Sequence, residues 1–168
     1  YSRAATKSEW RQLMAARAEA GVPLVIGTSG TCGTDATVDW MYEITREIAE
    51  EDGRRVKVAR LYSSQPASRV SEALDTGRIK PLTPAPDASK EAIGAMTNIV
   101  ALAGAEQIEA ALATGADIVL AGRTTDTAII AALPLSRGEH AGGAWHGAKI
   151  AECGALCSTN PTSGVVMV

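Results

Sequence analysis

The sequence predicts an α/β protein with three layers, in which helices cover both faces of a mostly parallel sheet. Short apolar runs rich in β-branched residues occur at residues 24–26 and 118–121, as in strands that are buried on both faces. Stretches with the apolar spacing of helices alternate with these runs. A loop rich in Gly, Thr or Ser follows each run, as in Rossmann-like folds.

The first elements follow from periodicity and from residues that start or stop helices. A helix is predicted over residues 7–20, with Ser8 as its N-cap and Gly21 at its end. After the strand at 24–26, a second helix is predicted over residues 35–52, and Gly53 would end it. Its apolar positions have helical spacing and are Val38, Met41, Tyr42, Ile44, Ile48 and Ala49.

The middle of the chain contains one strand and one segment without regular structure. Residues 56–62 alternate in polarity and predict a strand parallel to the first, and residues 68–74 predict a short helix. The loop at 80–87 contains three prolines and cannot be regular. Residues 99–102 are a strand or part of a helix, because short apolar runs fit both.

The last part repeats the order of helix, strand, loop and helix. A helix is predicted over 105–114 and leads into the strand at 118–121. The next helix runs from Ala128 to Leu133, where Pro134 would stop it. Further elements are a helical segment over 145–156 and a strand over 164–168.

The composition limits which classes of partner and which cellular compartment are expected. The 168 residues have a net charge of -3 and are 46% hydrophobic, which is typical of one globular domain and argues against nucleic acid as a partner. No apolar run is long enough for a membrane span. Three cysteines without a signal peptide favour the reducing cytoplasm. Because the chain lacks a starting Met and ends within a predicted strand, we expect a single domain or a fragment of a longer protein.

The loop after the first strand is the main candidate for ligand binding. Its small residues let backbone N–H groups approach an anion, and the following helix adds a favourable dipole. It lacks the Gly-Lys-Ser/Thr of a P-loop, and Ser29 replaces a glycine of the dinucleotide fingerprint, so neither ATP nor NAD is predicted. The alternative is a tight turn capped by Thr34 or Asp35. The candidate ligand-binding residues are Ser29, Gly30, Thr31, Gly33, Thr34 and Asp35.

Cys32 lies in the same loop, close to the predicted helix start. A helix N-terminus lowers the pKa of a thiol, so Cys32 is a candidate nucleophile. Free cysteines are often small buried spacers, and the sequence favours that interpretation.

The loop at 122–127 also follows a strand, and in open α/β sheets such loops gather around one crevice. Arg123 is suited to hold a carboxylate or phosphate, together with Thr124 and Thr125. Asp126 is a candidate general base. Alternatively, Asp126 caps the next helix and Arg123 pairs with a surface acid.

His146 is the first choice for proton transfer, with Glu152 following it in the chain. The alternative is a hydrogen-bonded structural histidine. His140, in a polar loop, is expected to be solvated. Zinc bound by His146, Cys153 and Cys157 is disfavoured because structural zinc usually has four ligands, so no metal is predicted, although metal bound by carboxylates alone stays open. No cofactor is indicated.

Three blocks of the sequence resemble the acyclic terpene utilisation AtuA family. They are VIGTSGTCGTDATVDWMYEITREIAEE (25–51), GADIVLAGRTTDTAIIAALPL (115–135) and GGAWHGAKIAECGALC (142–157). The resemblance implies a longer bacterial or fungal protein of the cytoplasm that acts in the breakdown of branched acyclic acids. The family is often grouped with enzymes that act on acyl-CoA. The positions that the resemblance marks are Gly30, Gly33, Asp35, Asp39, Arg123, Thr124, Asp126, Trp145, His146, Glu152 and Cys153.

Three hypotheses follow. The first is an enzyme acting on a small anionic substrate, a branched carboxylic acid or acyl-CoA, as a lyase, hydratase or isomerase, with acid–base work by His146, Asp126 and Glu152. The second is a non-catalytic subunit that binds acyl-CoA or a partner such as a carboxylase. The third is a homo-oligomer assembled through the apolar helix faces of residues 128–156.

Overall fold

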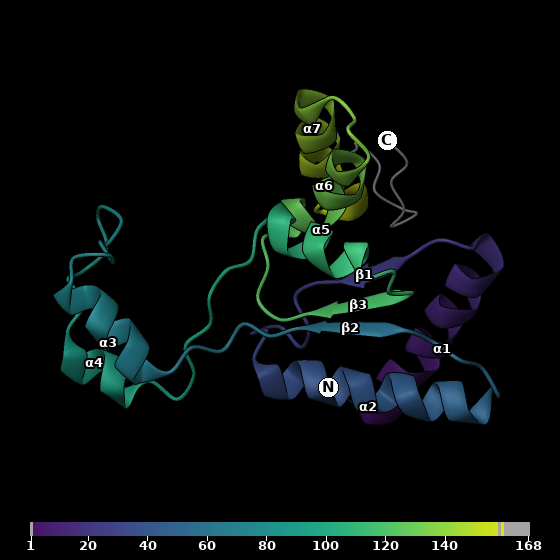
Figure 1. Ribbon diagram of the computed structural model, residues 1–168, viewed down its shortest axis with the longest axis horizontal. Coiled ribbons are helices and arrows are strands. Elements are labelled where there is room, and N and C mark those ends of the chain that lie inside the picture. The colour runs from purple at the N-terminus through teal and green to yellow at the C-terminus, as the bar shows by residue number, and fades with distance from the viewer. Residues whose placement is uncertain (1, 158, 160–168) are drawn as a thin grey trace.

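The computed structural model describes residues 2–157 and residue 159. Its sheet has three parallel strands in the order β1-β3-β2, and helices cover both faces (Figure 1). The strands are β1 (Leu24–Ile26), β2 (Val58–Leu61) and β3 (Ile118–Ala121). The predicted α/β fold with a parallel sheet is therefore confirmed. The second strand is shorter than the predicted 56–62, and β3 separates it from β1.

Two helices, α1 (Arg3–Ala20) and α2 (Asp35–Glu51), cover one face. Their apolar side chains pack on the side chains of the sheet that point to this face. The buried members of this core are Trp10, Met14, Val38, Met41, Ile44, Ile48, Ile118 and Leu120. The helix predicted over 35–52 is confirmed, and Gly21 ends α1 in the left-handed conformation as expected.

The predicted start of α1 is wrong. The helix begins four residues earlier than Lys7, and Ser2 is its N-cap, with Oγ accepting the N–H of Ala5 at 3.4 Å. Ser8 lies inside the helix. Arg3, Ala4 and Ala5, which precede Lys7, have high helix propensity, so the helix can extend back to the earlier cap.

The opposite face is covered by α5 (Ala105–Ala113) and α6 (Asp126–Ser136). Ile108 of α5 and Ala128 of α6 are buried there together with Ala121 of β3. The helix predicted over 105–114 is confirmed. Pro134 does not stop α6, which runs on to Ser136. Pro134 has no N–H to donate to the carbonyl of Ile130 four residues earlier, and Ile130 is on the exposed side of the helix.

The last described elements are α7 (Ala141–Ala151), which packs against α6, and a 3₁₀ helix (Gly154–Cys157). The helix predicted from residue 145 therefore begins four residues earlier. His140 is its N-cap, and its Nδ1 accepts the N–H of Gly143 at 3.2 Å. His140 is exposed, but it has this structural role as well. The strand predicted over 164–168 lies outside the described residues.

Residues 66–98 form an arm that projects from the carboxyl end of β2 (Figure 1). It contains α3 (Ala67–Asp75), which confirms the predicted short helix, and α4 (Lys90–Ala95), which was not predicted. The proline-rich loop between them has no helix or strand, as expected. Residues 99–102 are neither strand nor helix, because only an isolated antiparallel bridge joins Val100 to Ser64.

No helix in the described part of the chain is both long enough and apolar enough to cross a bilayer.

Candidate functional site

The carboxyl edge of the sheet contains a topological switch point between β1 and β3. These strands are neighbours, but the chain leaves β1 for α2 on one face and leaves β3 for α6 on the other. In open α/β sheets, ligands bind in the crevice outside strands that diverge in this way. We call residues 27–34 the first loop and residues 122–125 the second loop; both lie at this point.

The two loops, which the sequence predicted to gather around one crevice, contact each other directly. The N–H of Ser29 donates to the carbonyl of Ala121 at 2.9 Å, and the N–H of Thr124 donates to Thr28 Oγ1 at 3.2 Å. Gly33 has a φ of +70°, and a Cβ built on it would lie 2.3 Å from the backbone N of Arg123. Backbone packing therefore explains why residue 33 is a glycine, which supports the alternative that the first loop is a tight turn. Anion binding by the first loop stays a prediction.

Two hydroxyl groups are buried near this contact without a hydrogen-bond partner in the described structure. They are Ser29 Oγ and Thr124 Oγ1, in residues that are 1% and 0% exposed. A Cβ on Gly27 would lie 2.5 Å from Thr124 Oγ1, so only glycine fits beside it. Buried hydroxyl groups normally have a partner, so both retain the capacity to bind a ligand or a water molecule.

The first turn of α2 is bonded to the end of β2. Asp35 Oδ1 accepts the N–H groups of Ser63 and Ser64, both at 2.9 Å, and the N–H of Asp35 donates to Ser64 Oγ at 3.1 Å. Thr34 is the N-cap residue by position, but its side chain makes no cap bond. Asp35 therefore holds the base of the arm in place. Gly30 and the exposed Thr31 have positive φ values in the same loop.

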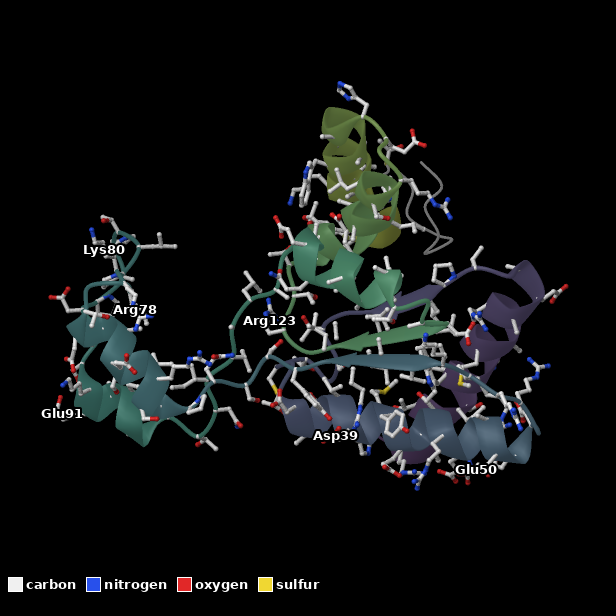
Figure 2. The ribbon with its side chains drawn as sticks, in the orientation of Figure 1. Asp39, Glu50, Arg78, Lys80, Glu91 and Arg123 are labelled. Carbon is white, nitrogen blue, oxygen red and sulfur yellow. The ribbon has the colours of Figure 1, made fainter. Side chains whose placement is uncertain are left out.

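Three residues of the second loop and the start of α6 have separate roles. Thr125 is the N-cap of α6, with Oγ1 accepting the N–H of Ala128 at 3.2 Å, so Asp126 does not cap this helix. Asp126 is the first residue of α6 and is exposed. The half-buried Arg123 makes no side-chain hydrogen bond or ion pair with any described residue. Figure 2 shows it beside the segments that join the arm to the rest of the molecule.

Glu152, at the end of α7, is brought to the start of α6. Its carboxylate accepts the Thr127 hydroxyl and pairs with Lys149 Nζ, and its side chain is 13% exposed. The hydrogen bond from Lys149, and then the one from Thr127, lower the pKa of Glu152. Asp126 lies close enough to contribute to the raised pKa of Lys149. Glu152 is therefore a carboxylate at neutral pH and lies near Asp126.

His146 does not join this group. It lies on the exposed surface of α7 and makes no hydrogen bond with a described residue. It precedes Glu152 by six residues, which corresponds to about 9 Å along a helix axis. Sequence spacing placed both residues in one helical segment, but only Glu152 reaches α6.

The cysteines and the neighbouring acidic residues can also be placed. Cys32, Cys153 and Cys157 are all exposed, so the expectation that Cys32 is a buried spacer is wrong. Over the residues that the structure describes, no three His, Cys, Asp or Glu side chains form a group suited to a metal ion. Asp39 pairs with Arg60 at 2.7 Å and accepts the hydroxyl of Tyr62, which holds β2 against α2.

A cavity of about 410 Å³ lies between the start of α2 and the base of the arm. Its volume is within the usual range for small-molecule sites. Polar groups come from Asp35, Ser64 and Asn98, and apolar surface comes from Met96 and Ile99. The cavity therefore offers both hydrogen-bonding groups and apolar surface next to the first loop.

Sequence reasoning missed Ser63, Ser64 and Lys149 as parts of this region. Ser63 and Ser64 directly follow the predicted second strand, so the rule that sites gather at carboxyl ends of strands would have found them. Nothing local in the sequence marks Lys149, because its role depends on the packing of α7 against α6.

The model of one known family, described as acyclic terpene utilisation family protein AtuA, matches residues 3–161. No curated protein matches the chain, and no solved structure does.

Proposed function

The chain belongs to the acyclic terpene utilisation AtuA family, and from this we propose that it is a cytoplasmic catabolic enzyme acting on a branched carboxylic acid or its acyl-CoA. The observation that most supports this proposal is the switch point between β1 and β3. There the first and second loops meet, and Arg123 makes no ion pair with any described residue. A small anion is the ligand that such a site would favour.

In this proposal, Arg123 binds the carboxylate or a CoA phosphate of the substrate. At the first turn of α6, Thr125 Oγ1 takes the N–H of Ala128, and the N–H groups of Asp126 and Thr127 together with the helix dipole favour an anion. The neighbouring cavity of about 410 Å³ gives room for the rest of a small acid. The buried hydroxyl groups of Ser29 and Thr124 are further candidate hydrogen-bonding groups.

Acid–base work is assigned to Asp126 and Glu152. Glu152 is a carboxylate at neutral pH, so it can accept a proton but has none to donate; Lys149 and Thr127 lower its pKa and make it a weaker base than a free carboxylate. Proton abstraction next to a carbonyl group starts hydration, dehydration and isomerisation alike, which fits a lyase, hydratase or isomerase. His146 would join only if α7 shifts or if another segment binds beside it.

Turnover of branched acyl-CoA and hydroxy-acid substrates by the purified protein tests this proposal. Asp126→Asn and Glu152→Gln should each lower kcat by about 100-fold or more, the usual share of a general acid or base. Arg123→Ala should raise KM by about tenfold or more, as expected for loss of a charge-assisted bond. Arg137→Ala, an exposed arginine beyond α6, is the matched control. If Asp126→Asn and Glu152→Gln both retain full turnover, the acid–base assignment is wrong.

The arm favours a second candidate, a non-catalytic subunit that binds acyl-CoA or a partner enzyme. Leu82 is 84% exposed and Met96 is 52% exposed, although both are large apolar residues. Exposed apolar residues are typical of contact surfaces where they form one patch. Saturable acyl-CoA binding without turnover of any substrate would support this candidate. Light scattering would show in the same samples whether the chain forms a homo-oligomer.

A further inference from the structure

A cavity of about 580 Å³ lies on the side of the molecule opposite the candidate site, near the start of β3. It is enclosed by the last turns of α1 and α2 and by residues 54–56, which lead from α2 to β2. Its floor is apolar, because Met14 and Ile118, which are 6% and 0% exposed, contribute to it. Its volume is within the usual range for small-molecule sites.

Two of the five charged groups that line this cavity, Arg17 and Asp52, are already paired. Arg17 donates to the carbonyl of Val22 at 2.9 Å and pairs with Asp117, and Asp52 pairs with Arg11. These interactions hold α1 to the start of β3 and to the end of α2. They are structural, so these groups are not available to a ligand.

Arg54 and Arg55 differ from Arg17, the other arginine that lines the cavity. Both are exposed, and neither side chain makes a hydrogen bond or an ion pair with a described residue. Glu19 is the one lining carboxylate without a described ion pair, so two unpaired guanidinium groups face a single unpaired acid. The C-terminal end of α2 favours nearby cations, which explains why arginines are tolerated here, but it does not explain the apolar floor beside them.

A second cavity, of about 420 Å³, lies on the other side of residues 54–56 and shares Arg54 and Arg55 with the first. Tyr42 and Val58 give it apolar surface as well. The same two cationic side chains therefore border apolar surface on both sides. A purely polar anion would leave that surface exposed to water, and a neutral apolar molecule would leave the guanidinium groups without a partner.

We propose that the cavity between α1 and α2 binds an anionic amphiphile, a carboxylate with an unbranched or branched aliphatic chain. Arg54 and Arg55 bind the carboxylate, and the chain lies over Met14, Val56 and Ile118. This site is separate from the one proposed at the carboxyl edge of the sheet. It would be a second binding site, which takes a substrate, a product or an effector that is itself an aliphatic carboxylate.

Binding of decanoate, measured by titration calorimetry below its micelle concentration, tests the proposal. Decanoate should bind saturably. Decanol, which lacks the carboxylate, and inorganic phosphate, which lacks the aliphatic chain, should each bind at least about tenfold more weakly. The double variant Arg54→Ala/Arg55→Ala should weaken decanoate binding by at least about tenfold. Arg137→Ala should leave it unchanged. Unchanged binding by the double variant, or phosphate binding equal to that of decanoate, would overturn the proposal.

The position of the aliphatic chain needs a separate variant. Ala18 lines the cavity and is exposed, so Ala18→Trp should fill the cavity without disturbing the core. Loss of decanoate binding with an unchanged thermal melting curve is the expected result. If Ala18→Trp binds decanoate as tightly as the unmodified protein, the chain does not lie between α1 and α2, and the assignment to this cavity is wrong.

Discussion

At the scale of single residues, the absence of a side chain decides how closely the two loops approach. Gly33 combines a positive φ with backbone contact to the second loop, and a Cβ there would overlap Arg123. Gly53, at the end of α2, has a similar φ of +61°, but a Cβ there would meet nothing within 4 Å. A comparison of Gly33 with Gly53 therefore separates the free-energy cost of the left-handed backbone from the cost of a clash with the second loop.

We predict that Gly33→Ala lowers the free energy of unfolding by roughly 2–5 kcal/mol, the sum of a left-handed backbone penalty and overpacking. Gly53→Ala should cost only about 1–2 kcal/mol, because it has the backbone penalty alone. Urea denaturation of both variants measures the difference. Equal losses would mean that the second loop moves aside, and that the loops are not packed as tightly as described.

At the scale of elements, α1 and α2 are joined by charged side chains as well as by their buried core. Lys7 contacts Glu47 at 2.5 Å and Glu51 at 2.6 Å, and Arg3 and Arg11 pair with the same two acids. These contacts raise the pKa of Lys7 and lower the pKa of both glutamates. All of these groups are near the surface, so salt will weaken the contribution.

The pKa directions predict how this contribution depends on pH. A lowered carboxyl pKa stabilises the fold above the unfolded pKa, about 4.3 for Glu, and the gain is lost as the pH falls through the folded value. The raised pKa of Lys7 keeps its own contribution until the pH rises above 10.5. Lys7→Met should therefore be less stable than the unmodified protein at pH 7 and approach it below pH about 4.

Thermal melting at several pH values, in low salt, measures this convergence. Lys80→Met is the matched control, because Lys80 is exposed in the arm and makes no ion pair with a described residue. A stability difference for Lys7→Met that stays constant from pH 7 to pH about 3 would contradict the ion-pair origin.

At the scale of the whole molecule, the arm is separate from the core. Neither of the two core clusters includes a residue between 66 and 98, and the buried Ile93 packs within the arm. A short antiparallel stem joins the arm to the sheet, with the N–H of Gln65 donating to Ile99 at 2.8 Å and that of Ala101 to Ser63 at 2.8 Å. The sheet and its helices therefore do not depend on the arm for their packing.

Replacing residues 67–97 by a short Gly-Ser linker should leave a folded protein. We expect its free energy of unfolding to change by no more than about 1 kcal/mol, because the cost of closing a loop depends weakly on its length. Circular dichroism and urea denaturation measure this. The same deletion removes one wall of the 410 Å³ cavity, so ligand binding at the carboxyl edge should be lost. An unfolded product would show that the arm is part of the core.

Several elements of the fold follow from the sequence because their signals are local. Apolar runs predicted β1 and β3, helical spacing predicted α2, and three prolines predicted the irregular loop of the arm. The errors also have local origins. Ser8 resembled a cap because serine is a common N-cap residue, and Pro134 resembled a stop because proline usually ends a helix, although α6 runs on to Ser136.

The sequence by itself determined the α/β class, most elements and the family, because each depends on neighbouring residues or on matching blocks. Only the tertiary structure decided that β3 separates β1 from β2, that Glu152 but not His146 reaches α6, and that the first loop packs on the second. The physical reason is distance along the chain. The bond between Thr28 and Thr124 joins residues 96 positions apart, and such contacts leave no periodic signal in either segment.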